Sequence, residues 1–207
     1  MKKFYQINSW AVGGPLYPWS SGYGPLSEMP FIEALPVIWR EWIKGPLMGQ
    51  GYPPGMSIDG GGKIWSDFIG NSGGAVPFFV SERVISDLKT IEVNVWRKTE
   101  MPIASIKSKR LKSLPYPKYY VIEAEPGIKV DYEASGVPLD GEGSPLIKQR
   151  DKNHQGPLTL RLDTWNGEDL VSQDPGATIR IICTEKVKEL AALQKWTNVE
   201  FTPIRVI

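Results

Sequence analysis

Hydrophobic and polar residues follow the same order at two places in the chain. In the first, an apolar stretch at residues 78–80 leads into Ser-Glu-Arg-Val, a helical pattern to Leu88 and an alternating stretch at 91–96. In the second, residues 181–183 lead into Thr-Glu-Lys-Val, a longer helical pattern to about Trp196 and an alternating stretch at 199–204. Because alternation with a period of two is typical of strands, the pattern predicts two similar strand–helix–strand units.

Each predicted helix begins at a hydroxyl residue that is followed by a glutamate. A Ser or Thr side chain at this position typically accepts a hydrogen bond from an unpaired amide of the first helical turn. We therefore expect Ser81 and Thr184 to be N-caps, with Glu82 and Glu185 at the positive ends of the helix dipoles. Helix capping explains these residues without a catalytic role, so the repeated unit is interpreted as structural.

The remaining pattern between residues 63 and 207 contains more strands than helices. Residues 119–124 and 128–132 are rich in β-forming residues, and the Pro126-Gly127 pair between them is typical of a type II turn. Further strands are expected at 158–163 and 178–182, after a long polar loop at 133–157 that is typical of a functional or mobile segment. The order of elements predicts an α+β fold with a largely antiparallel or mixed sheet and few helices.

Residues 1–62 differ in composition from the rest and are rich in Pro, Gly and Trp. One short helix is predicted, since residues 35, 38, 39, 42 and 43 form an apolar face that ends before Gly45-Pro46. We expect an irregular aromatic segment that packs on a core domain formed by residues 63–207. Alternatively, Trp19, Tyr23 and Tyr52 stay exposed and contact a partner.

Charge and composition narrow the classes of function. The net charge is +1, so the chain lacks the basic excess that nucleic acid or an anionic membrane would require. The basic residues near 107–112 are interpreted as a solvated turn, with phosphate contact as the alternative. No apolar run reaches membrane-spanning length. The N-terminus lacks the apolar region of a signal peptide, so we expect a cytoplasmic protein.

Few residues could form a catalytic or metal site. His154 is the only histidine and Cys183 the only cysteine, so a catalytic triad or a zinc site lacks partners, and no cofactor is predicted. The glycines at 60–62 resemble a phosphate-binding loop only superficially, because Ile64 follows the lysine. The acidic turn at 140–144 lacks the ligand spacing of a calcium loop. Carboxylate pairs at 123/125 and 131/133 share a strand face, which is more typical of solvated side chains than of a glycosidase.

Several motifs resemble those of bacterial immunity proteins from polymorphic toxin systems. These families have a Trp-x-Asp element before a Val-Ser-Glu-Arg helix start, as at Trp65-x-Asp67 and residues 80–83 here. The resemblance continues through residues 119–122, 130–136 and 184–204, although the second helix begins with Cys-Thr-Glu-Lys and residues 1–62 match no family.

The resemblance implies a protein that is not an enzyme and that neutralises a cognate secreted toxin, of a type VI or contact-dependent system, by binding it. Two regions are predicted to contact the toxin. One is aromatic, because rigid aromatic side chains carry much binding energy, and the other is acidic and could oppose a basic toxin cleft. The predicted contact residues are Trp19, Tyr23, Tyr52, Glu133, Asp140 and Glu142. The alternative is a small carbohydrate-active or carbohydrate-binding protein that uses its Trp/Tyr-rich loops.

Overall fold

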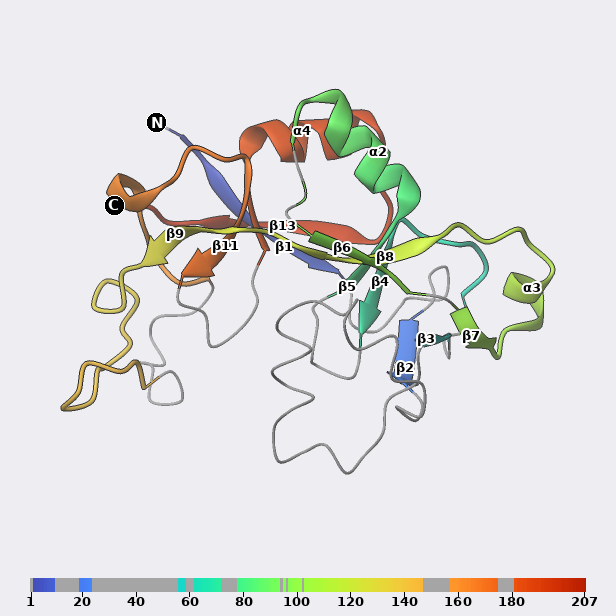
Figure 1. Ribbon diagram of the computed structural model, residues 1–207, viewed down its shortest axis with the longest axis horizontal. Helices are drawn as coiled ribbons and strands as arrows, with labels where there is room; N and C mark the ends of the chain where they lie inside the picture. Colours follow the sequence, from blue (N-terminus) through green and yellow to red (C-terminus); the bar gives the residue numbers. More distant parts are fainter. Residues whose placement is uncertain are drawn as a thin grey trace. The chain divides into compact units, whose positions relative to one another are not determined.

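The computed structural model describes residues 2–9, 19–23, 56–58, 62–71, 78–93, 95, 97–101, 103–146, 157–174 and 181–207. Over these residues the protein has an α+β fold with two β-sheets and few helices, as the sequence pattern predicts (Figure 1). The chain divides into two compact units. Unit 1 comprises Met1–Ile7, Ala124–Glu189 and Phe201–Ile207, and unit 2 comprises Asn8–Glu123 and Leu190–Glu200.

Unit 1 is built on a mixed six-stranded sheet in the order β10-β9-β11-β12-β1-β13. The strands are β1 (Phe4–Ser9), β9 (Pro126–Val130), β10 (Leu160–Arg161), β11 (Leu170–Asp174), β12 (Ile181–Thr184) and β13 (Val199–Ile204). The 3₁₀ helix η4 (Leu162–Thr164) follows β10, and helix α4 (Glu185–Leu193) follows β12. All four residues of β12 are buried, as expected for a strand with neighbours on both sides. The core contains Phe4, Ile128, Val130, Leu158, Leu160, Val171 and Ile182.

Unit 2 is built on a seven-stranded sheet in the order β6-β8-β5-β4-β2-β3-β7. The strands are β2 (Trp19–Tyr23), β3 (Met56–Ile58), β4 (Phe68–Asn71), β5 (Phe78–Ser81), β6 (Arg97–Glu100), β7 (Ile103–Ile106) and β8 (Tyr119–Glu123). Helix α2 (Glu82–Thr90) follows β5 and the short helix α3 (Lys109–Lys112) precedes β8. Phe68, Phe79, Leu88 and Tyr119 are among its fully buried side chains.

The two sheets have the same strand arrangement. When unit 1 is read as β13-β1-β12-β11-β9-β10, each strand corresponds in place to one of β6-β8-β5-β4-β2-β3. The pairing directions also agree, because β5–β8 and β12–β1 are antiparallel while β4–β2 and β11–β9 are parallel. The agreement extends to the end of each sheet, where β7 pairs with β3 in parallel and Val206 forms a parallel bridge to Leu160.

The register of equivalent strands is the same as well. Ser81 lies opposite Tyr119, and its counterpart Thr184 lies opposite Phe4. The first amide of each helix donates to the residue before the neighbouring strand: Glu82 N to Lys118 O at 2.9 Å and Glu185 N to Lys3 O at 3.2 Å. The sequence Lys118-Tyr-Tyr-Val-Ile therefore corresponds to Lys3-Phe-Tyr-Gln-Ile, a match that periodicity alone did not reveal.

This correspondence shows an exchange of strands along the chain. The first strand, β1, lies between β12 and β13 in the sheet of unit 1, whose other strands come from the second half of the chain. Its counterpart β8 directly precedes those strands in sequence but lies between β5 and β6 in the sheet of unit 2. Each half of the chain thus supplies one strand to the sheet that is built mainly from the other half.

Helices α2 and α4 end in the same way. Glu92 and Lys195 have positive φ angles of 59° and 55°. The next residue in each copy donates its amide to a carbonyl five positions back, from Val93 to Leu88 at 3.1 Å and from Trp196 to Ala191 at 2.9 Å. This left-handed ending satisfies carbonyls that the last helical turn leaves unpaired. Val93 and Trp196 are both buried, so the ending also directs an apolar side chain into the interior.

Three of the predicted elements are wrong. The expected strand at 91–96 is absent from its described residues, 91–93 and 95, because the left-handed Glu92 interrupts it, and β6 begins only at Arg97. Pro126-Gly127 is not a type II turn, since Gly127 lacks a positive φ and both residues belong to β9. Strand β8, which ends before the pair, and strand β9, which contains it, lie in different sheets instead of forming a hairpin. The strand predicted at 158–163 is reduced to β10, because η4 replaces its second half.

Other predictions are confirmed or lie outside the described residues. The strand at 199–204 is present as β13. The basic residues near 107–112, interpreted as a solvated turn, include the short helix α3, and the strand β7 before them was not predicted. The helix expected near residues 35–43 lies outside the described residues, and the boundary at residue 62 stays a prediction. None of the helices in the described part of the chain is long and apolar enough to span a membrane.

Candidate functional site

In unit 2, the Trp-x-Asp motif places a carboxylate at the centre of a hydrogen-bond cluster. Asp67 lies just before β4 and only 6% of its surface is exposed. Its carboxylate accepts a hydrogen bond from the Ser81 hydroxyl at 3.1 Å and forms an ion pair with Arg83 at 3.2 Å. It also accepts from the amide and hydroxyl of Thr197, at 3.0 and 3.1 Å. The Asp67 amide returns a bond to the Thr197 hydroxyl at 2.8 Å, so the two residues are linked in both directions.

The segment that contains Thr197 is held at further points. Arg83 donates to the Gln194 carbonyl, and the Trp196 indole nitrogen donates to Asp87 at 2.7 Å. The Asn198 amide donates to the Phe68 carbonyl at 2.8 Å. These contacts fasten residues 194–198 to the beginning of α2 and to β4. The motif residues in unit 2 therefore serve as internal connections.

The predicted N-cap function of Ser81 is wrong. Ser81 occupies the N-cap position with an extended backbone, but its side chain makes no cap hydrogen bond to the first turn of α2. The hydroxyl donates to the Asp67 carboxylate at 3.1 Å, and its oxygen accepts from none of the first-turn amides that a capping side chain would bind. Glu82 and Glu185 do lie in the first turns of their helices, as predicted.

Unit 1 repeats this arrangement around Asp169, which lies just before β11. The Thr184 hydroxyl donates to the Asp169 carboxylate at 2.6 Å, and Lys186 pairs with the same carboxylate at 3.0 Å. In both units, the backbone amide of the hydroxyl residue donates to the carbonyl of the aspartate. Asp169 and Asp67 are thus equivalent, as are Thr184 and Ser81. Sequence reasoning named Asp67 only as part of the Trp-x-Asp motif and missed Asp169. It predicted neither contact with a hydroxyl, because the two aspartates precede Ser81 and Thr184 by 14 and 15 positions with a strand between.

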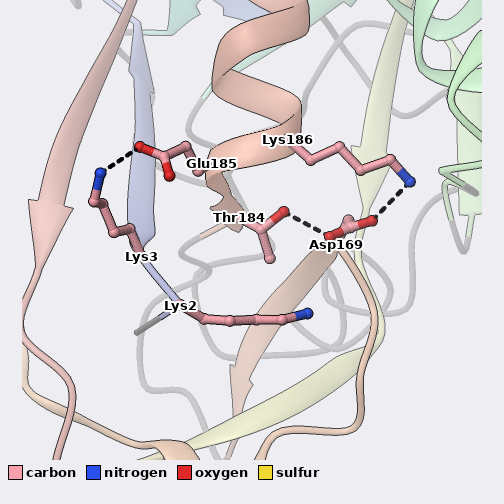
Figure 2. Close-up of a pocket in the computed structure, with 6 residues that line it drawn as sticks. All are labelled: Lys2, Lys3, Asp169, Thr184, Glu185 and Lys186. Atoms are coloured by element: carbon pink, nitrogen blue, oxygen red, sulfur yellow. Dashed lines mark hydrogen bonds and ion pairs between the residues drawn. The ribbon is translucent and has the colours of Figure 1, made fainter.

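The two copies differ in what lies next to the carboxylate. In unit 1 the Asp169 side chain lines a cavity of about 380 Å³ together with Lys2, Lys3, Thr184, Glu185 and Lys186 (Figure 2). The side chain of Asp169 is 22% exposed, compared with 9% for Asp67. The Asp169 amide has no hydrogen-bond partner among the described residues, whereas the Asp67 amide binds Thr197. We take this Asp169 cavity as the candidate functional site.

The side chains of the cavity form two ion pairs. Lys3 pairs with Glu185 at 2.8 Å, and that hydrogen bond lowers the pKa of the Glu185 carboxyl and raises the pKa of Lys3. Partial burial by itself would raise the pKa of Asp169, but the hydrogen bonds from Thr184 and Lys186 outweigh it and the pKa lies below its ordinary value. Both carboxyls are therefore charged at neutral pH. The Lys2 ammonium lies 3.9 Å from the centre of the Trp165 ring.

None of the predicted toxin-contact residues that the structure describes is among those that line the Asp169 cavity. Glu133, Asp140 and Glu142 are exposed in unit 1. Asp140 accepts hydrogen bonds from the amides of Glu142 and Ser144, at 2.9 and 2.8 Å, and so shapes its own turn. Trp19 and Tyr23 begin and end β2, but their side chains and all of Tyr52 lie outside the described residues. The structure neither supports nor contradicts a binding role for these residues.

Among the residues considered for catalysis, Glu123 contradicts the predicted solvated strand face. It is buried, with 7% of its surface exposed, while Glu125 is exposed and lies beyond the end of β8. Cys183 is fully buried in β12, and burial raises the pKa of its thiol. His154 lies outside the described residues. Within the described ranges, no group of three or more His, Cys, Asp and Glu side chains is placed to hold a metal ion.

No protein-family model matches the chain, and no curated protein matches it significantly. The resemblance to immunity proteins therefore rests on the sequence motifs alone.

Proposed function

We propose that this protein is an immunity protein, which binds a cognate antibacterial toxin and neutralises it by direct protein–protein contact. The observation that carries the proposal is that the motifs resembling those of immunity proteins form contacts within the fold. Asp67, Ser81 and Arg83 of these motifs bind one another and the Thr197 segment. A fold whose characteristic residues are committed to internal contacts supports a function performed by surface residues that differ between family members.

The exposed acidic turns of unit 1 support the choice of a protein partner. Glu133 and Glu142 are exposed, and the carboxylate of neither forms an ion pair or a hydrogen bond with a described residue. Free carboxylates on a turn can oppose a basic surface, and such charges chiefly accelerate association. A toxin whose target is anionic would present this kind of surface.

Co-expression tests the proposal. The protein is produced in cells together with the product of the adjacent gene, and survival is compared with cells that carry an empty vector. We expect rescue and a complex that elutes as one species in gel filtration. Failure to rescue together with failure to form a complex would refute the proposed function.

A matched pair of variants then tests the acidic contact. The double variant Glu133→Ala/Glu142→Ala should slow association about tenfold at low salt and by less at high salt, since salt screens exposed charges. Glu200→Ala removes an exposed acid outside the predicted contact regions and should leave association unchanged. An equal effect of both changes would locate the contact elsewhere.

A further inference from the structure

Among the described residues, the Asp169 cavity is the counterpart of a position that residues 194–197 occupy in unit 2. Strand order, register and hydrogen bonds identify Asp169, Thr184 and Lys186 with Asp67, Ser81 and Arg83. In unit 2 the aspartate and the basic residue hold a segment of the chain itself, residues 194–197. In unit 1 the same constellation borders a cavity of about 380 Å³.

Residues 194–197, which Asp67 and Arg83 bind in unit 2, indicate which chemical groups a ligand of the Asp169 cavity would present. Thr197 presents two donors, its amide and its hydroxyl, to one carboxylate oxygen of Asp67, and its hydroxyl accepts from the Asp67 amide. A carbonyl three residues earlier, that of Gln194, accepts from the basic side chain Arg83. A peptide with a Ser or Thr preceded by a free carbonyl reproduces this set of groups, whereas a free carboxylate has no hydrogen to donate to the aspartate.

Unit 1 retains the groups that would complete this set. The Asp169 oxygen that pairs with Lys186 makes no other hydrogen bond with a described residue, and an ionised carboxylate oxygen has room for a second donor. The Asp169 amide is free among the described residues to donate to a hydroxyl, as the Asp67 amide does. Lys186 stands where Arg83 stands and can donate to a carbonyl. The Asp169 carboxylate oxygen can thus accept a further hydrogen bond and the Asp169 amide can donate one. The Lys186 ammonium has three donors, of which the ion pair with Asp169 needs only one.

We propose that the Asp169 cavity is a peptide-binding site, which takes a Ser- or Thr-containing segment of a partner protein in the way that Asp67 takes Thr197. We take the partner protein to be the toxin, and only this identification rests on the proposed function. The hydroxyl and amide of the incoming residue donate to the carboxylate, its hydroxyl accepts from the Asp169 amide, and Lys186 binds a preceding carbonyl. The site selects Ser or Thr because a Val at that position would keep the amide donor but would lose the hydroxyl bond to the carboxylate and leave the Asp169 amide without an acceptor.

A synthetic peptide tests the site without the toxin. The probe is the capped peptide Leu-Gln-Lys-Trp-Thr-Asn, which copies residues 193–198, and the matched control replaces its Thr with Val. Each is titrated into the full-length ¹⁵N-labelled protein, and amide shifts are followed by NMR. We expect saturable shifts at Asp169, Thr184 and Lys186 with the Thr peptide, and affinity at least tenfold lower with the Val peptide.

Two protein variants make the result specific. Asp169→Asn keeps the shape of the side chain but removes its charge, and should weaken binding of the Thr peptide about tenfold. Glu189→Gln removes an exposed charge from α4, the helix that carries Lys186, and should not change the affinity. The inference is overturned if the Thr peptide causes no saturable shifts at Asp169, if the Val peptide binds equally well, or if shifts appear only around Asp67.

The peptide result and the rescue result are independent. Rescue without peptide binding would keep the immunity function and remove the Asp169 cavity from the interface. Peptide binding without rescue or complex formation would keep the site and assign it to a different protein partner.

Discussion

The difference between Asp67 and Asp169 gives a quantitative prediction. Replacing Asp67 with Ala removes the acceptor for the Ser81 hydroxyl, for the Thr197 amide and hydroxyl, and for Arg83. A hydrogen bond contributes about 0.5–1.5 kcal/mol, and more when the acceptor is charged. The Arg83 side chain is 49% exposed, so solvent screens its ion pair and it adds little. We expect Asp67→Ala to lower the free energy of unfolding by about 3–5 kcal/mol.

The same substitution in unit 1 should cost less. Asp169→Ala removes one hydroxyl bond, from Thr184, and an ion pair with Lys186, whose side chain is 48% exposed. The expected loss is about 1–2 kcal/mol. The difference between the two variants, about 2 kcal/mol, corresponds to the two hydrogen bonds that only Thr197 supplies.

Urea unfolding measures both losses. Tryptophan fluorescence and far-ultraviolet circular dichroism should be followed together, since coinciding transitions justify a two-state analysis. Thr197→Val tests the origin of the difference, because its effect and that of Asp67→Ala should be non-additive by about 1 kcal/mol or more. Losses that agree within about 0.5 kcal/mol for Asp67→Ala and Asp169→Ala would refute the reasoning from the Thr197 bonds.

Three further predictions concern packing, a buried hydroxyl and pH. Gly127→Ala should cost about 1–3 kcal/mol in urea unfolding, because a Cβ there would lie 2.5 Å from a Val171 methyl, while Gly141→Ala, with open space, should stay within about 0.5 kcal/mol. Tyr119→Phe should cost about 1–2 kcal/mol in thermal unfolding, since the buried Ser66 carbonyl loses its 2.6 Å bond. A lowered folded pKa means that Asp169 stabilises the fold above its unfolded pKa, roughly 4, and less as pH falls through the folded pKa. Urea unfolding between pH 7 and 3 should therefore show a shallower acid loss for Asp169→Asn, and an unchanged slope would contradict this.

Local patterns predicted the elements whose determinants lie close together in sequence. The repeated hydroxyl–Glu–basic–Val start, the helix that follows it and the strand β13 come from short-range preferences. These preferences failed where a single backbone angle or a distant partner decided the outcome. Glu92 ends the first copy in a left-handed conformation that alternation does not encode, and Ser81 donates to Asp67 instead of capping its helix.

The sequence by itself thus determined the α+β class, the repeated unit and the positions of helices α2 and α4. Only the tertiary structure decided which strands join which sheet, because hydrogen bonding between strands depends on chain path and not on local propensity. That choice sends β1 to unit 1 and β8 to unit 2. It also brings Asp67 into contact with Thr197, which lies 130 positions later in the sequence, and places Asp169 beside a cavity. Two copies of one local pattern acquired different surroundings, because long-range contacts, and not the pattern, determine what fills the space beside each carboxylate.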